Sequence, residues 1–408
     1  MTSRIEDAFR ADAGRILGAV TAYTGDLQLA EDAVQDAFLR AIAQERAGAE
    51  LRAPSAWITT AARRIAVDAI RRERTAARAL PTLAADARIV DDADLDAFSF
   101  TGDERLELIL TVCHPDLPEE PRLALALRFA CGVPTREVAA MLLVSETTMA
   151  ARLTRAKKRL HDSEIRFAVR DDEQVRTRMP DALSVIALLY TTGYAAPTSA
   201  EGRVLCGDAV DLARDALRIA GDDAEAQGLL ALVLLTEARR PSRVDPSGEL
   251  VALAEADRAL WDRRLIAEGE RLATGALQHG TGRFALQAGI AGLHAIAPTW
   301  EATDWSSIAR LYDGLVEQWP SPSARLARIV ARGYAEGIGA EGVRLELDAD
   351  EVLFQGPLAA QAFAVRGELG IRCGDTAGAR RDLREAIGLT EDPAVRRHLE
   401  RRLLAVGA

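Results

Sequence analysis

Residues 134–160 read PTREVAAMLLVSETTMAARLTRAKKRL, and this pattern predicts two short helices joined by a tight turn. Thr135 is placed to cap the first helix, and Ser145 to cap a second helix that begins at Glu146. An acidic residue suits that position because the N-terminal end of a helix dipole is positive. Residues 142–144 then form the turn, and the whole stretch is typical of a helix-turn-helix.

The second helix divides into an apolar stripe and a basic face. Apolar residues follow Met149 at four, seven and eleven positions, as Leu153, Ala156 and Leu160, so they share one buried side. The outward side resembles a DNA-recognition face. It carries Thr147, Thr148, Arg152, Arg155, Lys158 and Arg159. An ordinary amphipathic hairpin with a solvated basic side is the alternative, but the only two lysines of the chain, at positions 157 and 158, both lie here.

The composition is typical of a soluble globular protein with several domains. The 408 residues allow two or three cores, 49% of them are hydrophobic and 28% charged, and no apolar run is long enough to span a bilayer. The first residues, MTSRIEDAFRADAGRI, are charged where a signal peptide would be apolar, so we expect a cytoplasmic location. The net charge of −11 argues against indiscriminate coating of nucleic acid, so DNA contacts must come from local basic clusters.

The sequence predicts neither a metal site nor a catalytic site. Its cysteines, at positions 113, 131, 206 and 373, form no C-x-x-C pair and have no histidine at ligand spacing, so we expect reduced thiols and no metal. Cys113 and His114 are neighbours, but adjacent residues on a helix point about 100° apart and cannot readily act as a dyad. Without a P-loop, a G-x-G-x-x-G motif or a nucleophile–base pair, we expect no cofactor and no catalysis by the isolated chain.

Helical periodicity extends through nearly the whole chain, which predicts an all-α protein whose first unit covers residues 1–77. Within this unit, the segment LAEDAVQDAFLRAI is expected to bury one side, made of Ala30, Val34, Ala37, Phe38 and Ala41. Asp32, Asp36 and Arg40 are spaced by four and line another face, which is open to a basic partner. A solvated face with an ion pair between Asp36 and Arg40 is the alternative.

The next segment, PSAWITTAARRIAVDAIRRER, predicts a basic helix that opens at Pro54. Its periodicity predicts a buried side made of Ile58, Ala61, Ile65 and Ala69. Its exposed side carries Arg63, Arg64, Arg71, Arg72 and Arg74. This is a second cationic cluster, separate from the helix-turn-helix.

Residues 78–103 predict a flexible acidic linker between the two basic parts. Carboxylates outnumber the single Arg88 between residues 83 and 103; they are Asp86, Asp91, Asp92, Asp94, Asp96 and Asp103. A string of carboxylates could imitate a nucleic-acid strand, and a solvated tether without contacts is the alternative.

Residues 164–408 are again helical. The segment AAQAFAVRGELGIRCGDTAGARRDLREAIGLTEDPAVRRHLERRLLA has the small and large apolar spacing and the Gly-Asp break of a tetratricopeptide-like helical pair. A cluster of arginines and acids around ARRPSRVDPSGEL is a possible regulatory site. It comprises Arg239, Arg240, Arg243, Asp245, Asp257 and Trp261. A structural ion-pair network around a turn is the alternative.

One string in this part, EVLFQGP at residues 351–357, reproduces the cleavage site of a picornaviral protease that is used to remove tags. An engineered replacement and a natural coincidence both remain open, so the string carries no functional argument.

Together these segments resemble the extracytoplasmic-function (ECF) sigma factors, the small promoter-specificity subunits of bacterial RNA polymerase. AEDAVQDAFLRA is similar to the helix of that family that binds core polymerase, and PSAWITTAARRIAVDAIRRER to the segment that opens the minus-10 element. HPDLPEEPRLALALRF with the helix-turn-helix is similar to the domain that reads the minus-35 element. The region after residue 163 resembles the fused helical-repeat extension of one subgroup.

The resemblance implies a function for each part of the chain. Residues 1–77 form the region-2-like domain, 78–103 the linker, 104–163 the region-4-like domain and 164–408 a regulatory domain. The implied partners are core RNA polymerase, for Asp32, Asp36 and Arg40, and promoter DNA, for the two basic clusters, with no membrane. We also expect the extension to contact the sigma portion and tune its activity. Many members carry Asn where Arg64 stands, so no minus-10 sequence preference is transferred.

Two other functions fit parts of the sequence. A conventional helix-turn-helix regulator would bind duplex DNA without polymerase and would leave the clusters of Asp32 and Arg63 unused. A helical-repeat scaffold would use its basic hairpin to contact protein, and would ignore DNA and polymerase.

Overall fold

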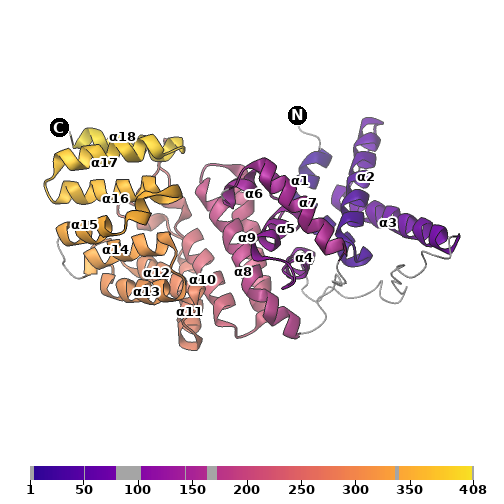
Figure 1. Cartoon of the computed structure of the whole chain (residues 1–408), viewed down its shortest axis with the longest axis horizontal. Helices are drawn as coiled ribbons and strands as arrows, with labels where there is room; N and C mark the ends of the chain where they lie inside the picture. Colours follow the sequence, from indigo (N-terminus) through magenta and orange to yellow (C-terminus); the bar gives the residue numbers. More distant parts are fainter. Residues whose placement is uncertain are drawn as a thin grey trace. The chain divides into compact units, whose positions relative to one another are not determined.

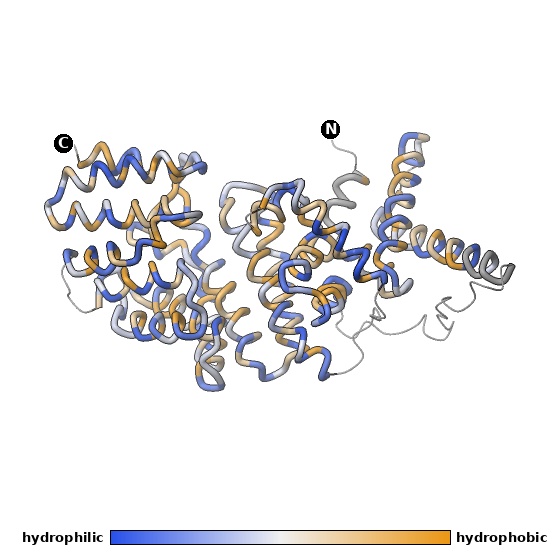
Figure 2. Tube along the Cα trace, viewed as in Figure 1, coloured by the Kyte–Doolittle hydropathy of each residue, from blue (hydrophilic) through white to orange (hydrophobic). Residues whose placement is uncertain are grey.

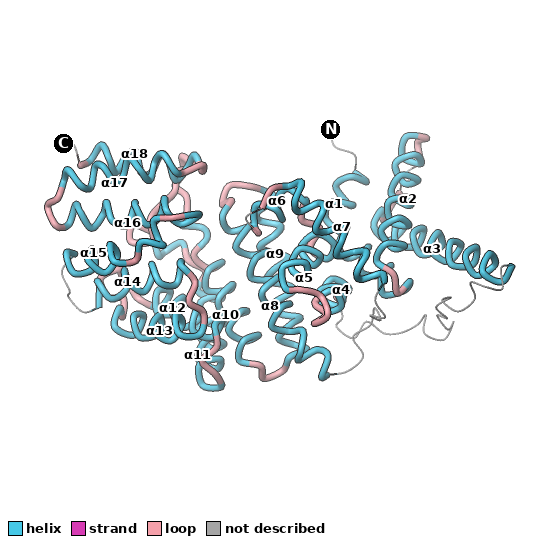
Figure 3. The backbone as a smooth tube through the Cα atoms, in the orientation of Figure 1, coloured by secondary structure: helices cyan, strands magenta, loops and turns pink. Residues whose placement is uncertain are grey.

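The computed structural model consists of helices joined by loops in the part of the chain that it describes (Figures 1 and 3), in agreement with the predicted all-α fold. It describes residues 4–49, 51–79, 103–142, 144–162, 172–335 and 340–406. Among these residues there are eighteen α-helices and no strand, and the one β-type pairing is an isolated bridge between Val244 and Leu250. None of the described helices is long and apolar enough to cross a membrane.

The described chain divides into two compact units, 1–192 with 207–221 and 193–206 with 222–408. Unit 1 therefore contains the helices of the sigma-like portion together with most of two helices from the expected extension. Its helices are α1 (Arg4–Thr24), α2 (Leu27–Arg46), α3 (Pro54–Ala79), α4 (Glu104–Val112), α5 (Glu119–Leu125), α6 (Thr135–Met141), α7 (Glu146–Asp162), α8 (Asp172–Ala195) and α9 (Ala200–Ala220). A π-helical turn, Ala126–Ala130, follows α5.

Helices α1, α2 and α3 form a bundle. Gly25 has a φ of 66°, a left-handed conformation that turns the chain between α1 and α2 at little cost for glycine. Asp26 then caps α2, because its carboxylate accepts the backbone N–H of Gln28 at 2.8 Å and of Leu29 at 3.1 Å. The buried side of α2 agrees with the prediction at four of its five positions, while Phe38 is only partly buried.

The buried side of α3 differs from the predicted one. Ile58 is fully buried as expected, but Ala62 and Ala66 are the residues at 0% exposure behind it, while Ala61 and Ile65 are only partly buried. Three residues spaced by four positions form one line along a helix, and alanine in that line lets α1 and α2 approach α3 closely. The predicted stripe instead includes Ile65, a larger side chain that is only partly buried.

Unit 2 consists of successive packed helices. After α10 (Ala224–Glu237), these are α11 (Arg263–His279), α12 (Arg283–Ile296), α13 (Trp305–Gln318), α14 (Pro322–Ala335), α15 (Ala340–Ala349), α16 (Ala359–Arg372), α17 (Thr376–Leu389) and α18 (Pro393–Ala405). Four hydrophobic clusters follow one another along the chain, each built by helices adjacent in sequence. A core made by successive helix pairs is the signature of a helical-repeat domain.

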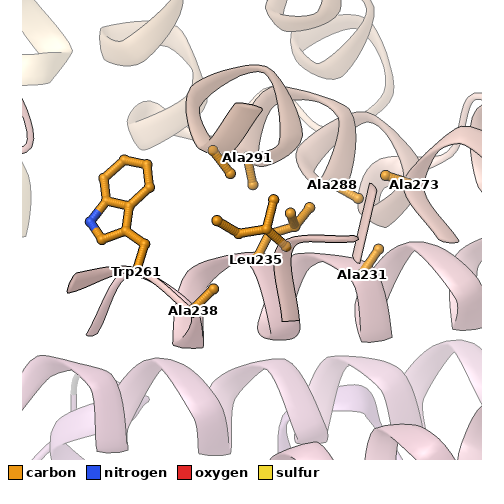
Figure 4. Packing of buried hydrophobic residues seen from close by; sticks show 9 residues of the cluster. Ala231, Leu235, Ala238, Trp261, Ala273, Ala288 and Ala291 are labelled. Atoms are coloured by element: carbon orange, nitrogen blue, oxygen red, sulfur yellow. The ribbon is translucent and has the colours of Figure 1, made fainter. Parts of the chain in front are cut away.

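The first of these clusters shows the packing. Leu235 of α10 lies among Ala231, Ala273, Ala288 and Ala291, so small residues of three helices surround one large side chain (Figure 4). Hydrophobic and hydrophilic stretches alternate along most of the tube in Figure 2, as expected of helices that bury one side, whereas α10 is apolar nearly all round.

The string at residues 351–357 is part of this domain's structure. Leu353 is fully buried in the cluster between α14 and α16, and Phe354 packs edge-on against Phe363 with ring centroids 5.0 Å apart. The guanidinium of Arg366 lies over the Phe354 ring at 4.3 Å. The string that matches the protease site therefore lies in a segment that packs into the domain through Leu353 and Phe354.

The start of α12 is capped by an acid from another helix. The Glu225 carboxylate of α10 accepts the N–H groups of Phe284 and Ala285, all at 3.0 Å. We expect Glu225→Ala to lower the free energy of unfolding by about 1–3 kcal/mol, because buried N–H groups lose a charged acceptor. Chemical denaturation measures the change, with exposed Glu270→Ala on α11 as the control. Equal stability of the two variants would contradict this role.

Candidate nucleic-acid and protein interfaces

Helix α7 has the buried stripe predicted for it. Met149, Leu153, Ala156 and Leu160 are all at most 5% exposed. Ser145 caps the helix as expected, since its hydroxyl accepts the N–H of Thr148 at 3.2 Å. The blue of hydrophilic residues runs along this helix in Figure 2.

The predicted cap of α6 is wrong. Pro134 is the N-cap, and its carbonyl accepts the N–H groups of Glu137 at 2.9 Å and Val138 at 3.0 Å. Helical bonding thus starts one residue before Thr135, whose hydroxyl is left inside the first turn and makes no cap hydrogen bond. Proline suits this start because its φ is already near the helical value.

Most of the expected recognition face is solvent-exposed. The exposed members are Thr147, Thr148, Arg155, Lys158 and Arg159. Arg152 differs, because its side chain is 28% exposed and its guanidinium pairs with Glu120 of α5 at 2.5 Å. Arg152 thus lies on the outward side but is only partly exposed, and a carboxylate of α5 competes with DNA for its guanidinium.

Helix α3 presents a second cationic surface. Arg63, Arg64, Arg71 and Arg72 are exposed, and within the described residues none of them has a carboxylate within 4.0 Å. The backbone of Arg74 lies in the helix, while its side chain falls outside what the structure describes. Arg72 donates its Nε–H to the Asp68 carbonyl at 3.2 Å, and exposed arginines of this kind can bind phosphates.

Helix α2 presents an acidic face. Asp32, Asp36 and Arg40 are exposed, and Asp36 pairs with Arg40 at 3.1 Å while both side chains stay more than half exposed. An exposed pair of this kind contributes little stability, so both groups remain available. The sequence interpretation missed Leu39, which is 63% exposed beside them. Its position off the buried stripe was the available signal.

Asp103 does not behave as part of a solvated linker. Its side chain caps α4 through the Arg105 N–H at 2.8 Å and pairs with the Arg105 guanidinium at 3.0 Å, and it is 6% exposed. The predicted linker therefore extends too far at this end. Asp103 belongs to the start of α4, where it is the carboxylate that the buried Arg105 needs beside it. The other acids of the predicted linker, Asp86 to Asp96, lie outside the described residues.

In unit 2, the possible regulatory cluster is engaged within the domain. Arg240 pairs with Glu237 at 2.8 Å. Trp261 is 3% exposed and donates its indole N–H to the Ser242 hydroxyl at 2.8 Å. Asp257 accepts the N–H of Ala259 at 2.9 Å and so caps a short 3-10 turn. These contacts favour a structural network.

The loop that follows is also held by contacts within the domain. Asp245 accepts the N–H and the hydroxyl of Ser247 at 2.9 and 2.6 Å, and the N–H of Glu249 at 2.9 Å. Arg243 stacks over the Tyr194 ring at 3.6 Å and donates to the Tyr194 carbonyl. The Glu249 carboxylate pairs with Arg397 of α18 at 2.5 Å, which ties the loop to the end of the domain.

His294 is a half-buried base beside arginines. Its ring stacks on Trp300, with centroids 6.0 Å apart, and meets Trp305 edge-on at 5.2 Å. Burial, together with the positive charges of Arg239 and Arg258, lowers the pKa of His294 to about 4. The imidazole is therefore neutral in the folded protein at pH 7.

This pKa predicts an acid-sensitive domain. Between pH 6.5 and 4 the unfolded chain binds a proton at His294 that the folded chain does not, so stability falls as the pH drops through this window. We expect a loss of about 2 kcal/mol at pH 5 relative to pH 7.5, and His294→Phe should remove most of it while keeping the aromatic packing. Urea denaturation at both pH values measures the difference. The same pH dependence in wild type and variant would contradict the assignment.

Three family models match this chain. Sigma-70 region 2 matches residues 8–76, sigma-70 region 4 matches residues 107–160, and a family of unknown function (DUF6596) matches residues 178–277. With an all-α fold, two cationic helix surfaces and a helix-turn-helix, the chain belongs to the ECF-type sigma factors with a fused C-terminal extension, and it has a sigma factor's role in promoter recognition. An uncharacterized protein of Rhizobium meliloti (strain 1021) is 36% identical to it over 331 residues, which are 79% of this chain and 77% of that protein.

Proposed function

We propose that this sigma factor binds core RNA polymerase through the exposed face of α2 and acts in the cytoplasm. Asp32 and Asp36 supply negative charge for a basic polymerase surface, and Leu39, one turn after Asp36, supplies an apolar contact. Charged and apolar residues together suit a protein interface, in which charge steers the encounter and the apolar residue supplies affinity.

The two cationic helices bind different parts of the promoter. In the proposal, Arg63, Arg64, Arg71 and Arg72 of α3 hold the backbone of the opened minus-10 strand, with Arg74 beside them. Arg155, Lys158 and Arg159 of α7 bind phosphates of the minus-35 duplex, while Thr147 and Thr148 at its start lie nearest the base edges. Arg152 contributes only after leaving Glu120. The proposal depends on one observation: α3 of the region-2 domain and α7 of the region-4 domain both expose basic residues.

The extension modulates this activity. Its helices α8 and α9 contact the region-4 helices: Arg178 donates to the Leu110 carbonyl at 3.2 Å, and Asp181 pairs with Arg122 at 2.7 Å. These contacts support an influence of the extension on the region-4 domain. They also argue against testing that role by truncation, because removing residues 164–408 would uncover the buried α4.

Binding of the purified chain to core polymerase tests the proposal. The expected result is a stoichiometric complex with polymerase from a related high-GC bacterium, together with weak binding of the free chain to duplex DNA. Tight duplex binding by the free chain, without any polymerase complex, would instead support a conventional helix-turn-helix regulator.

A further inference from the structure

Arg152 occupies the middle of one outward line of side chains on α7. Four residues follow one another there at intervals of four, three and four positions, which places them in a single line along the helix. They are Thr148, Arg152, Arg155 and Arg159. The first residues of a recognition helix meet base edges, and in the proposed function Arg155 and Arg159 meet phosphates. Arg152 lies between these two parts of the helix.

The guanidinium of Arg152 is held by an acid of another helix. Its Nη1 atom is buried and lies 2.5 Å from Oε1 of Glu120, on α5, which packs against α7. Arg155 and Arg159 differ, because within the described residues neither has a carboxylate within 4.0 Å. Arg155 donates instead to the Ala151 carbonyl of its own helix at 3.3 Å. Arg152 is therefore the one arginine of this line whose orientation is set by an ion pair in the described chain.

The ion pair leaves one edge of the Arg152 guanidinium available. A guanidinium carries five N–H donors in one plane, so Nε and Nη2 remain when Nη1 faces a carboxylate. The side chain is 28% exposed. Within the described residues, neither Nε nor Nη2 of Arg152 makes a hydrogen bond, and neither is fully buried. This edge can therefore donate two parallel hydrogen bonds to a ligand with two acceptors.

A guanine fits this edge better than a phosphate does. Guanine presents O6 and N7 in the major groove, and these two acceptors match an arginine edge bidentately. A phosphate also offers two acceptors, but it is negatively charged, and the Glu120 side chain is 50% exposed beside the pair. The Glu120 charge repels a phosphate and leaves the neutral edge of a base unaffected, so the pair favours a base.

Leaving Glu120 for a phosphate would bring Arg152 little. One phosphate contact raises the affinity about fivefold at 0.15 M salt, and a partly exposed ion pair is worth up to about fivefold. These two effects nearly cancel, because the ion pair is lost when the phosphate contact forms. A base contact through the Nε–Nη2 edge requires no such exchange, and a side chain that is already oriented loses less freedom on binding.

We propose that Glu120 is a positioning residue for promoter recognition. It holds Arg152 so that the Nε–Nη2 edge contacts O6 and N7 of one guanine in the minus-35 element. Arg152 then reads a base, while Arg155, Lys158 and Arg159 bind phosphates. The inference rests on the proposed function and adds to it a base class for one position of the element, together with the residue that fixes the contact.

Selection from a promoter library tests the assignment. Holoenzyme made with the full-length chain binds promoter fragments whose minus-35 element is randomised, and the bound fragments are sequenced. Wild type should enrich guanine at one position, and Arg152→Gln should abolish this enrichment while the other positions keep theirs. Glu120→Gln keeps the shape of the side chain and removes its charge. It should lower the preference for guanine at the same position about fivefold, because Arg152 then also binds phosphates of any sequence.

The neighbouring acid provides the matched control. Glu119 is exposed in the same first turn of α5, and Arg152 pairs with Glu120 rather than with it, so Glu119→Gln should select the same sequences as wild type. In an Arg152→Gln background, Glu120→Gln should change nothing further, and circular dichroism checks that all variants are folded.

Three outcomes would overturn the positioning role of Glu120. They are an unchanged guanine preference in Glu120→Gln, an equal loss in Glu119→Gln, and an effect of Glu120→Gln that persists without Arg152. A base other than guanine at the position that depends on Arg152 would overturn the base class. Enrichment of no sequence by wild-type holoenzyme, with a core polymerase that is active with its own sigma factors, refutes the proposed function and this inference with it.

Discussion

Replacing Arg155, Lys158 and Arg159 together by glutamate is expected to weaken holoenzyme binding to a promoter by at least about 100-fold. All three side chains are exposed along α7, so the substitution leaves the buried stripe intact and changes only the charge that faces DNA. Phosphate contacts supply most of the affinity for DNA, and each reversed charge turns an attraction into a repulsion.

The matched control changes the same amount of charge elsewhere. Arg264, Arg271 and Arg384 are exposed arginines of unit 2, and their replacement by glutamate should leave promoter binding within about twofold. Replacement of the α7 set by glutamine should lower the slope of affinity against salt by about three. An unchanged salt slope, measured by fluorescence anisotropy, would show that α7 does not meet phosphates.

The second large effect is expected at the polymerase. Asp32→Arg with Asp36→Arg should lower the affinity for core polymerase at least about 30-fold, because charges buried in an interface cost more than about 2 kcal/mol when their partner is mismatched. Helix α2 should keep its structure, since both side chains are exposed and the ion pair between Asp36 and Arg40 is itself exposed to solvent. Titration of labelled protein with core polymerase measures the change.

Two exposed acids of unit 2 provide the control for this experiment. Glu270→Arg with Glu385→Arg makes the same change in net charge and should leave polymerase affinity unaltered. Equal losses in both double variants would mean that net charge governs the association, and the face of α2 would lose its assigned role. Leu39→Ser should weaken binding without altering its salt dependence, because this side chain is apolar.

Local patterns predicted the helices and the recognition helix well. The stripe of α7 and the cap at Ser145 depend on neighbours within one helical turn, and both are confirmed. The helix start at Pro134 and the buried side of α3 were predicted wrongly. In each case the periodicity was compatible with two neighbouring choices of residue. Backbone hydrogen bonding decided where the helix starts, and the close approach of another helix decided which side of α3 is buried.

Contacts between distant segments could not be predicted in the same way. Arg152 lies on the outward side of α7 by periodicity, yet it pairs with Glu120 of α5. Arg105 looks like a surface residue in sequence, but it is buried against an acid more than one hundred positions away, Asp208. Only the folded chain brings Arg105 of α4 and Asp208 of α9 together.

Run-off transcription is the most direct test of the account. Full-length protein, core polymerase and a library of genomic promoter fragments from a related high-GC bacterium are combined, and discrete transcripts are mapped. The account predicts start sites that depend on the added chain and disappear with either charge-reversed set, on α7 or on α2. Absence of any chain-dependent transcript, with a polymerase that is active with its own sigma factors, would contradict it.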